Sequence, residues 1–139
     1  MKEIMAIVRM KKTGVTKRAL VETGVAGFTA LKVLGRGRLV EDTSVIMPCK
    51  EKLLAMAIDD INEVEEAEQE VTSFLDDSRF FPRRLFTILA HDEDVPRIVE
   101  AITRVNITER QVGDGIILVL PVDDAVRVRT GESGDAAIW

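Results

Sequence analysis

Apolar residues recur along this chain in two rhythms, one typical of strands and the other typical of helices. Residues 4–10, apolar except for Arg9, and the apolar run at 116–120 predict buried strands, because a strand that is covered on both faces needs no polar alternation. Residues 27–34 and 85–90 form two further apolar runs of strand length. The pattern therefore predicts four strands.

Two other segments have the spacing of amphipathic helices. Thr13 is placed to cap the first helix, and Gly24 is placed to end it. The apolar side of this helix consists of Val15, Ala19 and Leu20. The second helix follows the acidic residues 92–94, whose charge favours a helix N-terminus. Its stripe has a period of 3.6 residues and consists of Val95, Ile98, Val99, Ile102 and Val105.

The order of these elements is β-α-β, a long insertion, and then β-α-β. This order predicts an α+β fold of the ferredoxin-like kind, in which both helices lie on one face of an antiparallel sheet. The other face would expose apolar side chains to water, so we expect several copies of the chain to pack there. At 139 residues, the chain is expected to form a single domain over 1–139.

The insertion, at about residues 39–84, is too long for an ordinary connection within a compact domain. It contains a helical stripe formed by Leu53, Ala57, Ile61, Val64, Ala67 and Val71, and seven of the twelve residues 59–70 are acidic. One interpretation is a solvated helix or a partly disordered arm. The other is a mobile effector loop whose amphipathic helix docks on a partner protein. The sequence alone leaves both open.

Composition narrows the classes of function. The formal net charge of −5 argues against a general nucleic-acid binder, which needs a broad basic surface. Cys49 is the only cysteine, so an internal disulfide cannot form, which fits a reducing cytoplasm. No apolar stretch approaches the roughly 18 residues that a transmembrane helix requires. We therefore expect a cytoplasmic protein.

Glycine and arginine gather in three short segments, which are GRGR at 35–38, GDG at 113–115 and RVRTGE at 127–132. Glycines let backbone N–H groups come close to an anion, and arginines bind phosphate through paired donors. Each segment alone is more often a tight turn or an exposed strand face. The three together indicate a site for the phosphates of a nucleotide.

At this point the chain resembles the P-II family of signal-transduction proteins. The resemblance rests on GFT at 27–29, VLGRGR at 33–38, GDGIILV at 113–119 and VRVRTGE at 126–132, with DDA at 123–125 before the last. The family forms trimers of ferredoxin-like subunits that bind ATP or ADP in clefts between subunits. It senses 2-oxoglutarate and reports nitrogen and energy status through a long loop, the T-loop.

The resemblance implies a nucleotide site that is shared between subunits. Four residues are implied at the base of the T-loop: Thr29, Gly35, Gly37 and Arg38. Four more are implied in the phosphate loop: Thr108, Gly113, Asp114 and Gly115. Arg127 and Arg129 would reach the phosphates from the neighbouring subunit. Arg83 matches a basic residue that the family uses near the carboxylate of 2-oxoglutarate.

The chain departs from the family pattern at several places. Ile116 stands where the family usually has a lysine on the phosphates. Leu39 stands where many members have a glutamine that helps to hold Mg²⁺ and 2-oxoglutarate, which argues against sensing of 2-oxoglutarate by the usual geometry. The absence of tyrosine excludes the loop uridylylation that enteric members use. The insertion is longer than the usual T-loop, and is more similar to that of the nitrogenase-associated P-II proteins of archaea and anaerobes.

These observations lead us to expect a regulator that is not an enzyme, with ATP or ADP as its ligand. It would act on nitrogenase or another nitrogen-metabolism protein, as a homotrimer or as a hetero-oligomer with a P-II paralogue. The alternatives are a regulator of an ammonium transporter, which would meet the membrane only indirectly, a regulator of another metabolic enzyme, and a small nucleotide-dependent enzyme. His91, the only histidine, is better placed to start a helix than to act as a base.

Overall fold

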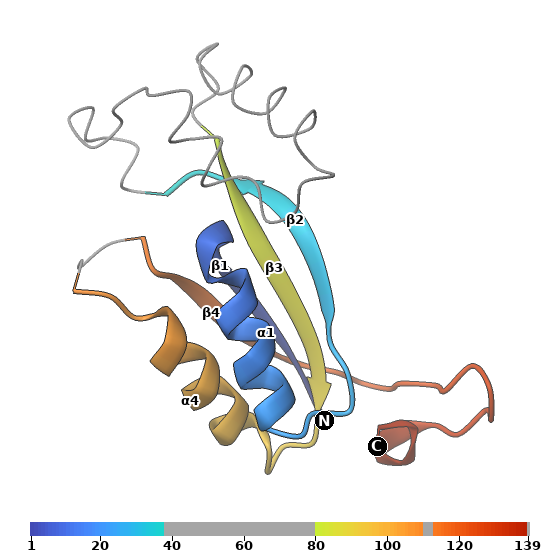
Figure 1. Cartoon of the computed structure of the whole chain (residues 1–139). Coiled ribbons are helices and arrows are strands. Elements are labelled where there is room, and N and C mark those ends of the chain that lie inside the picture. Colours follow the sequence, from blue (N-terminus) through green and yellow to red (C-terminus); the bar gives the residue numbers. More distant parts are fainter. Residues whose placement is uncertain (38–79, 110–112, 139) are drawn as a thin grey trace.

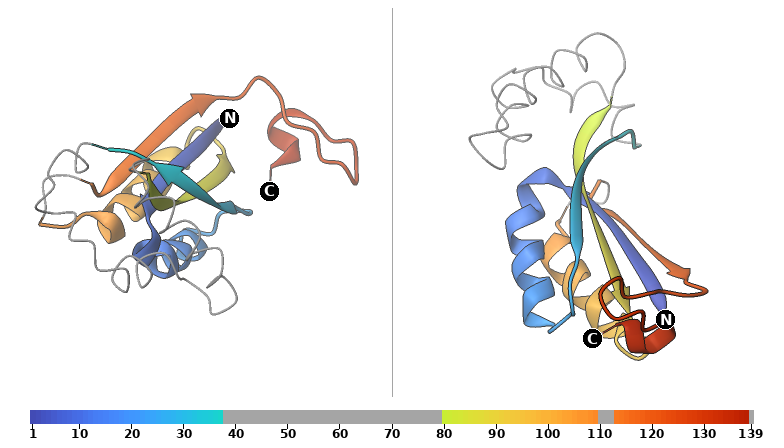
Figure 2. Two further views of the ribbon diagram at one scale, coloured as in Figure 1. Left: turned by 90° about the horizontal axis from the view of Figure 1, so that it is seen from above. Right: turned by 90° about the vertical axis from the view of Figure 1, so that its right-hand side faces the viewer.

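The computed structural model describes residues 1–37, 80–109 and 113–138. They form an antiparallel four-stranded sheet with two α-helices on one face, as Figures 1 and 2 show. The elements along the chain are β1 (Lys2–Arg9), η1 (Met10–Lys12), α1 (Thr13–Glu22), β2 (Thr29–Gly35), β3 (Phe81–Ala90), α4 (Val95–Asn106), β4 (Gly115–Pro121) and η5 (Gly134–Ala137). The predicted α+β, ferredoxin-like order of strands and helices is confirmed.

The strands lie in the order β2-β3-β1-β4, so β1 and β3 are central and β4 is an edge. In β1, Ile4, Ala6 and Val8 point towards the helices and are fully or almost fully buried. The core between sheet and helices consists of these three with Leu20, Phe86, Ile88, Ala90, Ile98 and Ile102. The strands alternate because only one of their two faces is covered by helices.

The helices begin and end close to the predicted positions. Thr13 is the first residue of α1 and not its cap, and its hydroxyl donates a hydrogen bond to the Met10 carbonyl at 2.6 Å. Gly24 follows the end of α1 with a φ of 73°, a conformation that favours glycine. Asn106, the buried last residue of α4, donates from Nδ2 to Thr16 Oγ1 at 2.9 Å and so joins the two helices.

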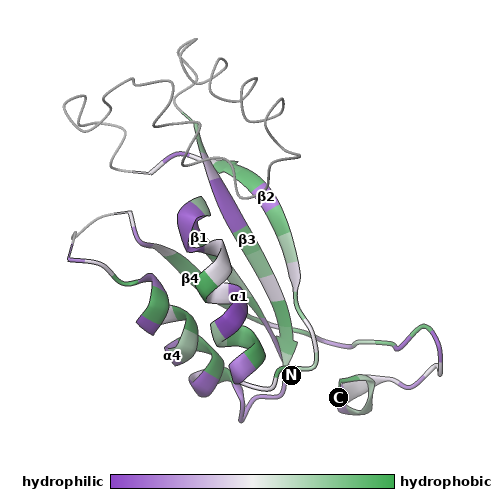
Figure 3. Cartoon of the chain, in the orientation of Figure 1, coloured by the Kyte–Doolittle hydropathy of each residue, from purple (hydrophilic) through white to green (hydrophobic). Residues whose placement is uncertain are grey.

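The prediction that residues 116–120 are buried is wrong for the single chain. β4 is an edge strand, and Ile116 and Leu118 are 54% and 40% exposed. They lie opposite Ile7 and Met5 on the face of the sheet that no helix covers. This open face continues across β2 at Leu31, which is 51% exposed, and Figure 3 shows the apolar character of the strands.

β3 begins at Phe81, four residues before the predicted start. Arg83 lies opposite Arg9 of β1 and Val33 of β2, so it belongs to the sheet and not to the insertion. The β-strand propensity of the residues gave no reason to extend the strand through two consecutive arginines. The predicted helical stripe of the insertion, with Arg38, Leu39 and Cys49, lies outside the described residues.

Candidate nucleotide site

The predicted T-loop base and phosphate loop lie at the same end of the sheet, on its two opposite edge strands, β2 and β4. Gly35 is the last residue of β2 and lies opposite Phe81, while Gly115 is the first residue of β4 and lies opposite Val8. Gly37 follows β2 at the same end, where β1 also finishes (Figure 1). Arg38 lies outside the described residues. Antiparallel pairing therefore places two of the three glycine-rich segments at one end of the sheet, with β3 and β1 between them.

Gly115 sits where no other residue fits without a shift of the backbone. Its φ is 121°, and a Cβ atom added to it would lie 2.1 Å from the Ile7 carbonyl oxygen. Gly113 also has a positive φ, of 90°. The phosphate loop thus approaches β1 closely, in a backbone conformation that glycine adopts at little cost.

Asp114 ties this loop to the end of α4. Its carboxylate accepts hydrogen bonds from the Thr108 backbone N–H at 2.9 Å and from the Thr108 hydroxyl at 2.6 Å. The hydroxyl bond is the main reason why the pKa of Asp114 lies below its ordinary value; desolvation, the second-largest effect, opposes it, and the N–H bond and the charges of Arg9 and Lys12 lower the pKa further. Thr108 therefore lies where the resemblance placed it, beside the glycine-rich loop.

Arg9, the last residue of β1, completes this cluster and was not among the residues predicted from the sequence. Its Nη2 lies 3.0 Å from Asp114 Oδ1, and its Nε donates to the Gly113 carbonyl at 2.8 Å. The side chain is only 7% exposed. A charged residue at the end of an apolar run is ordinary in sequence, so no local signal distinguished it.

Arg83 adds a second cation at this end of the sheet. It lies opposite Arg9 across β1 and β3, and its guanidinium carbon stands 5.7 Å from the centre of the Phe81 ring. Burial, and then the charge of Arg9, lower the pKa of the Arg83 guanidinium from its ordinary value. A Cβ added at Gly35 would lie 3.7 Å from Arg83 Cγ. A half-buried cation beside these glycines favours an anionic ligand.

The placement of Thr29 at the T-loop base is wrong. Thr29 is the first residue of β2 and Gly35 the last, which separates them by about 20 Å at the usual rise of a strand. Thr29 instead lines a hollow at the opposite end of the sheet, together with Val122, Asp124 and Ala125. Thr29 therefore lies with the segment that leads to the C-terminal arginines.

The segment after β4, which carries Arg127 and Arg129, leaves the sheet at that opposite end and projects from the body of the chain (Figures 1 and 2). Arg127 pairs with Glu132 and donates from Nη2 to the Ala136 carbonyl at 3.0 Å. The Gly131 N–H donates to the Arg127 carbonyl at 2.8 Å and closes the turn. Arg129 is exposed, as is Val128, at 101%. The turn is thus held in shape by its own contacts.

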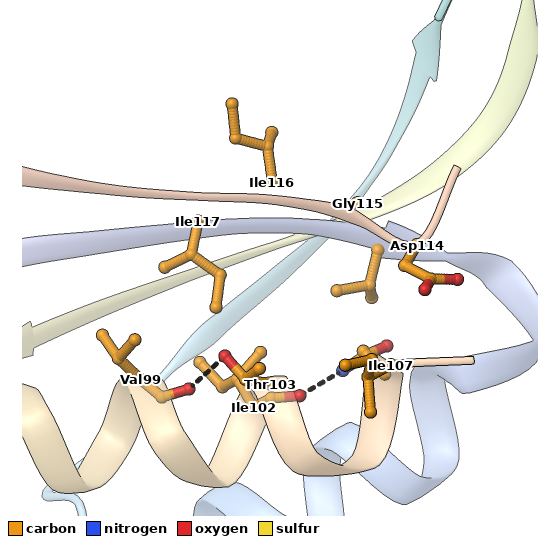
Figure 4. A pocket seen from close by; sticks show the side chains of 10 residues that line it. Val99, Ile102, Thr103, Ile107, Asp114, Gly115, Ile116 and Ile117 are labelled. Atoms are coloured by element: carbon orange, nitrogen blue, oxygen red, sulfur yellow. Dashed lines mark hydrogen bonds between the residues drawn. The ribbon is translucent and has the colours of Figure 1, made fainter. Parts of the chain in front are cut away.

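An apolar groove of ≈ 320 Å³ runs between α4 and β4, and Asp114 and Gly115 lie at one end of it (Figure 4). Ile117 points into it towards Val99 and Ile102, whereas Ile116 points away, to the open face. Ile116, which stands where the family usually has a lysine, is therefore directed to the side of the sheet that also carries Arg83.

Two negative findings concern only residues 1–37, 80–109 and 113–138. They hold no group of three or more His, Cys, Asp or Glu residues that could bind a metal ion. None of their helices is both long enough and apolar enough to cross a membrane.

Comparisons with known proteins cover nearly the whole chain. Residues 1–132 match the family model described as Nitrogen regulatory protein P-II. The Nitrogen fixation nifHD region GlnB-like protein 2 of Methanobacterium ivanovii is 40% identical over 138 residues, which are 99% of each chain. The protein of the same name from Methanothermobacter marburgensis is 37% identical over 141 residues, 99% of this chain and 100% of the relative. The Nitrogen regulatory protein P-II of Azospirillum brasilense is 33% identical over 138 residues, 99% of this chain and 100% of the relative.

Proposed function

This chain belongs to the P-II family of nitrogen regulatory proteins, and from that premise we propose that it binds ATP or ADP and signals to a protein of nitrogen metabolism. The observation that carries the proposal is the separation of its glycine-rich and arginine-rich segments. Gly115 is the first residue of β4, whereas Arg127 lies beyond the last residue of that strand, so one chain does not bring them together. A complete site requires a second copy.

In the proposed site, one copy supplies the glycines and its neighbour supplies the arginines. Gly35, Gly37 and the loop 113–115 would offer backbone N–H groups to the phosphates, with Arg38 from the same copy. Arg127 and Arg129 of the neighbour would neutralise the phosphate charge. Because Thr29 lies at the same end as the C-terminal segment, we assign it to the neighbour's half of the site.

We propose ATP or ADP as the principal ligand, and a lesser role for 2-oxoglutarate and Mg²⁺. Arg83 could hold a carboxylate of 2-oxoglutarate, since it is a half-buried cation at the same end of the sheet. Leu39 has no oxygen or nitrogen in its side chain, so it supplies no ligand to Mg²⁺. Any binding of 2-oxoglutarate therefore needs a geometry other than the family's usual one.

The assembly we propose is a trimer, either of this chain alone or with a P-II paralogue. The open face of the sheet is apolar from Leu31 on β2 to Leu118 on β4, and both are substantially exposed in the single chain. Packing this face against other copies removes it from water. The same assembly would bring the C-terminal arginines to a neighbour's glycines.

The target we propose is nitrogenase or another protein of nitrogen metabolism, reached through the long insertion. The names of the two methanogen relatives place them in a nitrogen fixation region, and both match this chain over its full length. An ammonium transporter or another metabolic enzyme remains the alternative target. Catalysis by the chain itself is disfavoured because His91 follows β3 at the end of the sheet opposite the phosphate loop.

The arginines give the direct test of the shared site. Replacing Arg129 with alanine removes a charge-assisted contact to phosphate, so ATP affinity should fall roughly 10- to 100-fold. Arg127→Ala should weaken binding at least as much, because it also releases Glu132 and the turn. Isothermal titration calorimetry with ATP measures both effects.

Arg18→Ala is the matched control, since Arg18 is exposed on α1, in the helix layer and away from both halves of the site. It should bind ATP as the unchanged protein does. If Arg127→Ala and Arg129→Ala also keep full affinity, the C-terminal segment takes no part in the site.

The insertion gives the test of signalling. Deleting residues 51–73 should leave the trimer and ATP binding in place, because neither proposed half-site uses them, and should abolish regulation of the target. Nitrogenase activity after addition of ammonium, in cells carrying the full chain or the deletion, measures this. Arg129→Ala serves as the comparison, because it keeps the insertion while weakening nucleotide binding. Regulation that survives the deletion would assign signalling to another part of the chain.

A further inference from the structure

We propose that Arg9 is a positioning residue for the nucleotide site: it fixes the phosphate loop, residues 113–115, in the orientation that presents N–H groups to an anion. The inference rests on the proposed function, since it assigns Arg9 a part in nucleotide binding. It goes further because Arg9 belongs to none of the three glycine- and arginine-rich segments, and its contacts lie within its own chain.

The first argument is the burial and the partners of this guanidinium. Arg9 is 6% exposed, and a buried charge is costly unless it is paired and hydrogen-bonded. Its Nε donates to the Gly113 carbonyl at 2.8 Å, and its Nη2 pairs with Asp114 Oδ1 at 3.0 Å. A longer contact of 3.5 Å joins Nη1 to Thr108 Oγ1. One side chain therefore contacts both ends of the connection between α4 and β4.

The second argument is the geometry of the peptide bond. In a trans peptide the C=O and the following N–H point in opposite directions. Because Arg9 holds the Gly113 carbonyl, the N–H of Asp114 is turned away from the buried guanidinium. Glycine can rotate its flanking peptide planes at little cost, and Gly113, with a φ of 90°, is free of side-chain restraint. The hydrogen bond from Arg9 therefore selects one of several accessible orientations of this peptide.

The third argument is electrostatic. The Asp114 carboxylate lies within the loop that is proposed to approach phosphates, and an unpaired carboxylate there would repel them. Arg9 neutralises it at 3.0 Å, and Thr108 donates to it twice. Lysine could supply the positive charge but not the fork of donors that contacts Gly113 and Asp114 together. This difference separates positioning from simple neutralisation.

The experiment compares Arg9→Lys with Arg9→Met by titration with ATP and by NMR of the nucleotide-free protein. If Arg9 positions the loop, both variants should bind ATP roughly 10-fold more weakly, because the charge alone does not restore the loop. Both should also show a second set of signals or exchange broadening at the amides of Asp114 and Gly115, which the unchanged protein lacks. Normal affinity in Arg9→Lys together with a single set of loop signals would overturn the proposal.

Two further variants complete the design. Lys11→Gln removes an exposed positive charge two residues from Arg9 and should change neither readout. Thr108→Val removes the hydroxyl bond to Asp114 without changing a charge, so it should shift both readouts in the same direction even if Arg9→Met does not fold. If the unchanged protein binds no ATP, the proposed function fails, whereas the NMR readout still decides whether Arg9 fixes the loop.

Discussion

Replacing Gly115 with alanine should destabilise this protein by at least about 3 kcal/mol. Two costs combine at this position. A φ of 121° is strained for any residue with a side chain, and the new Cβ would meet the Ile7 carbonyl oxygen at 2.1 Å. That neighbour is backbone of the central strand β1, so relief requires β1 and β4 to separate where β4 begins. Urea unfolding followed by circular dichroism measures the loss.

Variants at two other glycines distinguish the cost of backbone strain from the cost of the steric clash. Gly24→Ala places a side chain at a φ of 73° with no heavy atom within 4 Å, so it should cost only about 1–2 kcal/mol for the backbone strain. Gly14→Ala, at the second residue of α1 with no heavy atom within 4 Å, should instead stabilise the protein by about 0.4–1 kcal/mol, because alanine restricts the unfolded chain more than glycine does. All variants are compared at one protein concentration, because association would add to the measured stability.

A Gly115→Ala variant no less stable than Gly24→Ala would contradict the close approach of β4 to β1. The expected loss has a functional consequence as well. Gly115 is adjacent to Asp114, whose contacts with Arg9 and Thr108 depend on the position of β4. Any variant that folds with β1 and β4 apart should therefore also lose affinity for ATP.

The sequence was sufficient for the order of elements, because helical and strand periodicity are local properties. The stripe of α4 illustrates this: Ile98 and Ile102 are buried, as their spacing requires. Local patterns failed where pairing between distant segments decides the structure. Arg83 joins β3 because the ends of β1 and β2 lie on either side of it, and nothing near Arg83 in the sequence indicates those partners.

The exposure of β4 was mispredicted for a different reason. An uninterrupted apolar run is compatible with a central strand, and equally with an edge strand whose free face another copy covers. Only the strand order, with β4 at the edge, distinguishes the two within one chain. The apolar run then becomes an argument about assembly and not about the core of the subunit.

The candidate site was predictable where its chemistry is concentrated in short motifs. Residues 113–115 form one of the glycine-rich segments, and Thr108, which only the resemblance implied, lies beside them. Thr29 was misplaced because its motif does not show that Thr29 begins the strand that Gly35 ends, which puts the two residues at opposite ends of the sheet. Arg9 was missed because its partner Gly113 is 104 positions away. Contacts of that kind are set by topology.

The prediction with the widest consequence concerns the open face of the sheet. One charged side chain placed on this face should dissociate the proposed trimer. Leu118 lies opposite Met5 on this face and is 40% exposed in the single chain, so Leu118→Glu should leave the fold of the subunit intact. In a trimer that packs these faces together, each copy would bury an unpaired carboxylate at a cost of several kcal/mol. The trimer should therefore be replaced by single chains.

Light scattering at micromolar concentration measures this directly. The unchanged protein should show about three times the mass of one chain, as expected for a closed symmetric trimer of the family, and Leu118→Glu should show the mass of one. Val21→Glu is the control, because Val21 is 67% exposed on α1, in the helix layer that lies on the opposite face of the sheet. It should remain a trimer.

The same variant tests whether assembly and nucleotide binding are one property. Because the glycines of one copy and the arginines of its neighbour are needed together, Leu118→Glu should lose ATP affinity although it changes no residue of the proposed site. A Leu118→Glu protein that stays trimeric would show that the open face is not the interface. A monomeric variant that binds ATP normally would mean that one chain holds the whole site, and the separation of Gly115 from Arg127 would then have no role in binding.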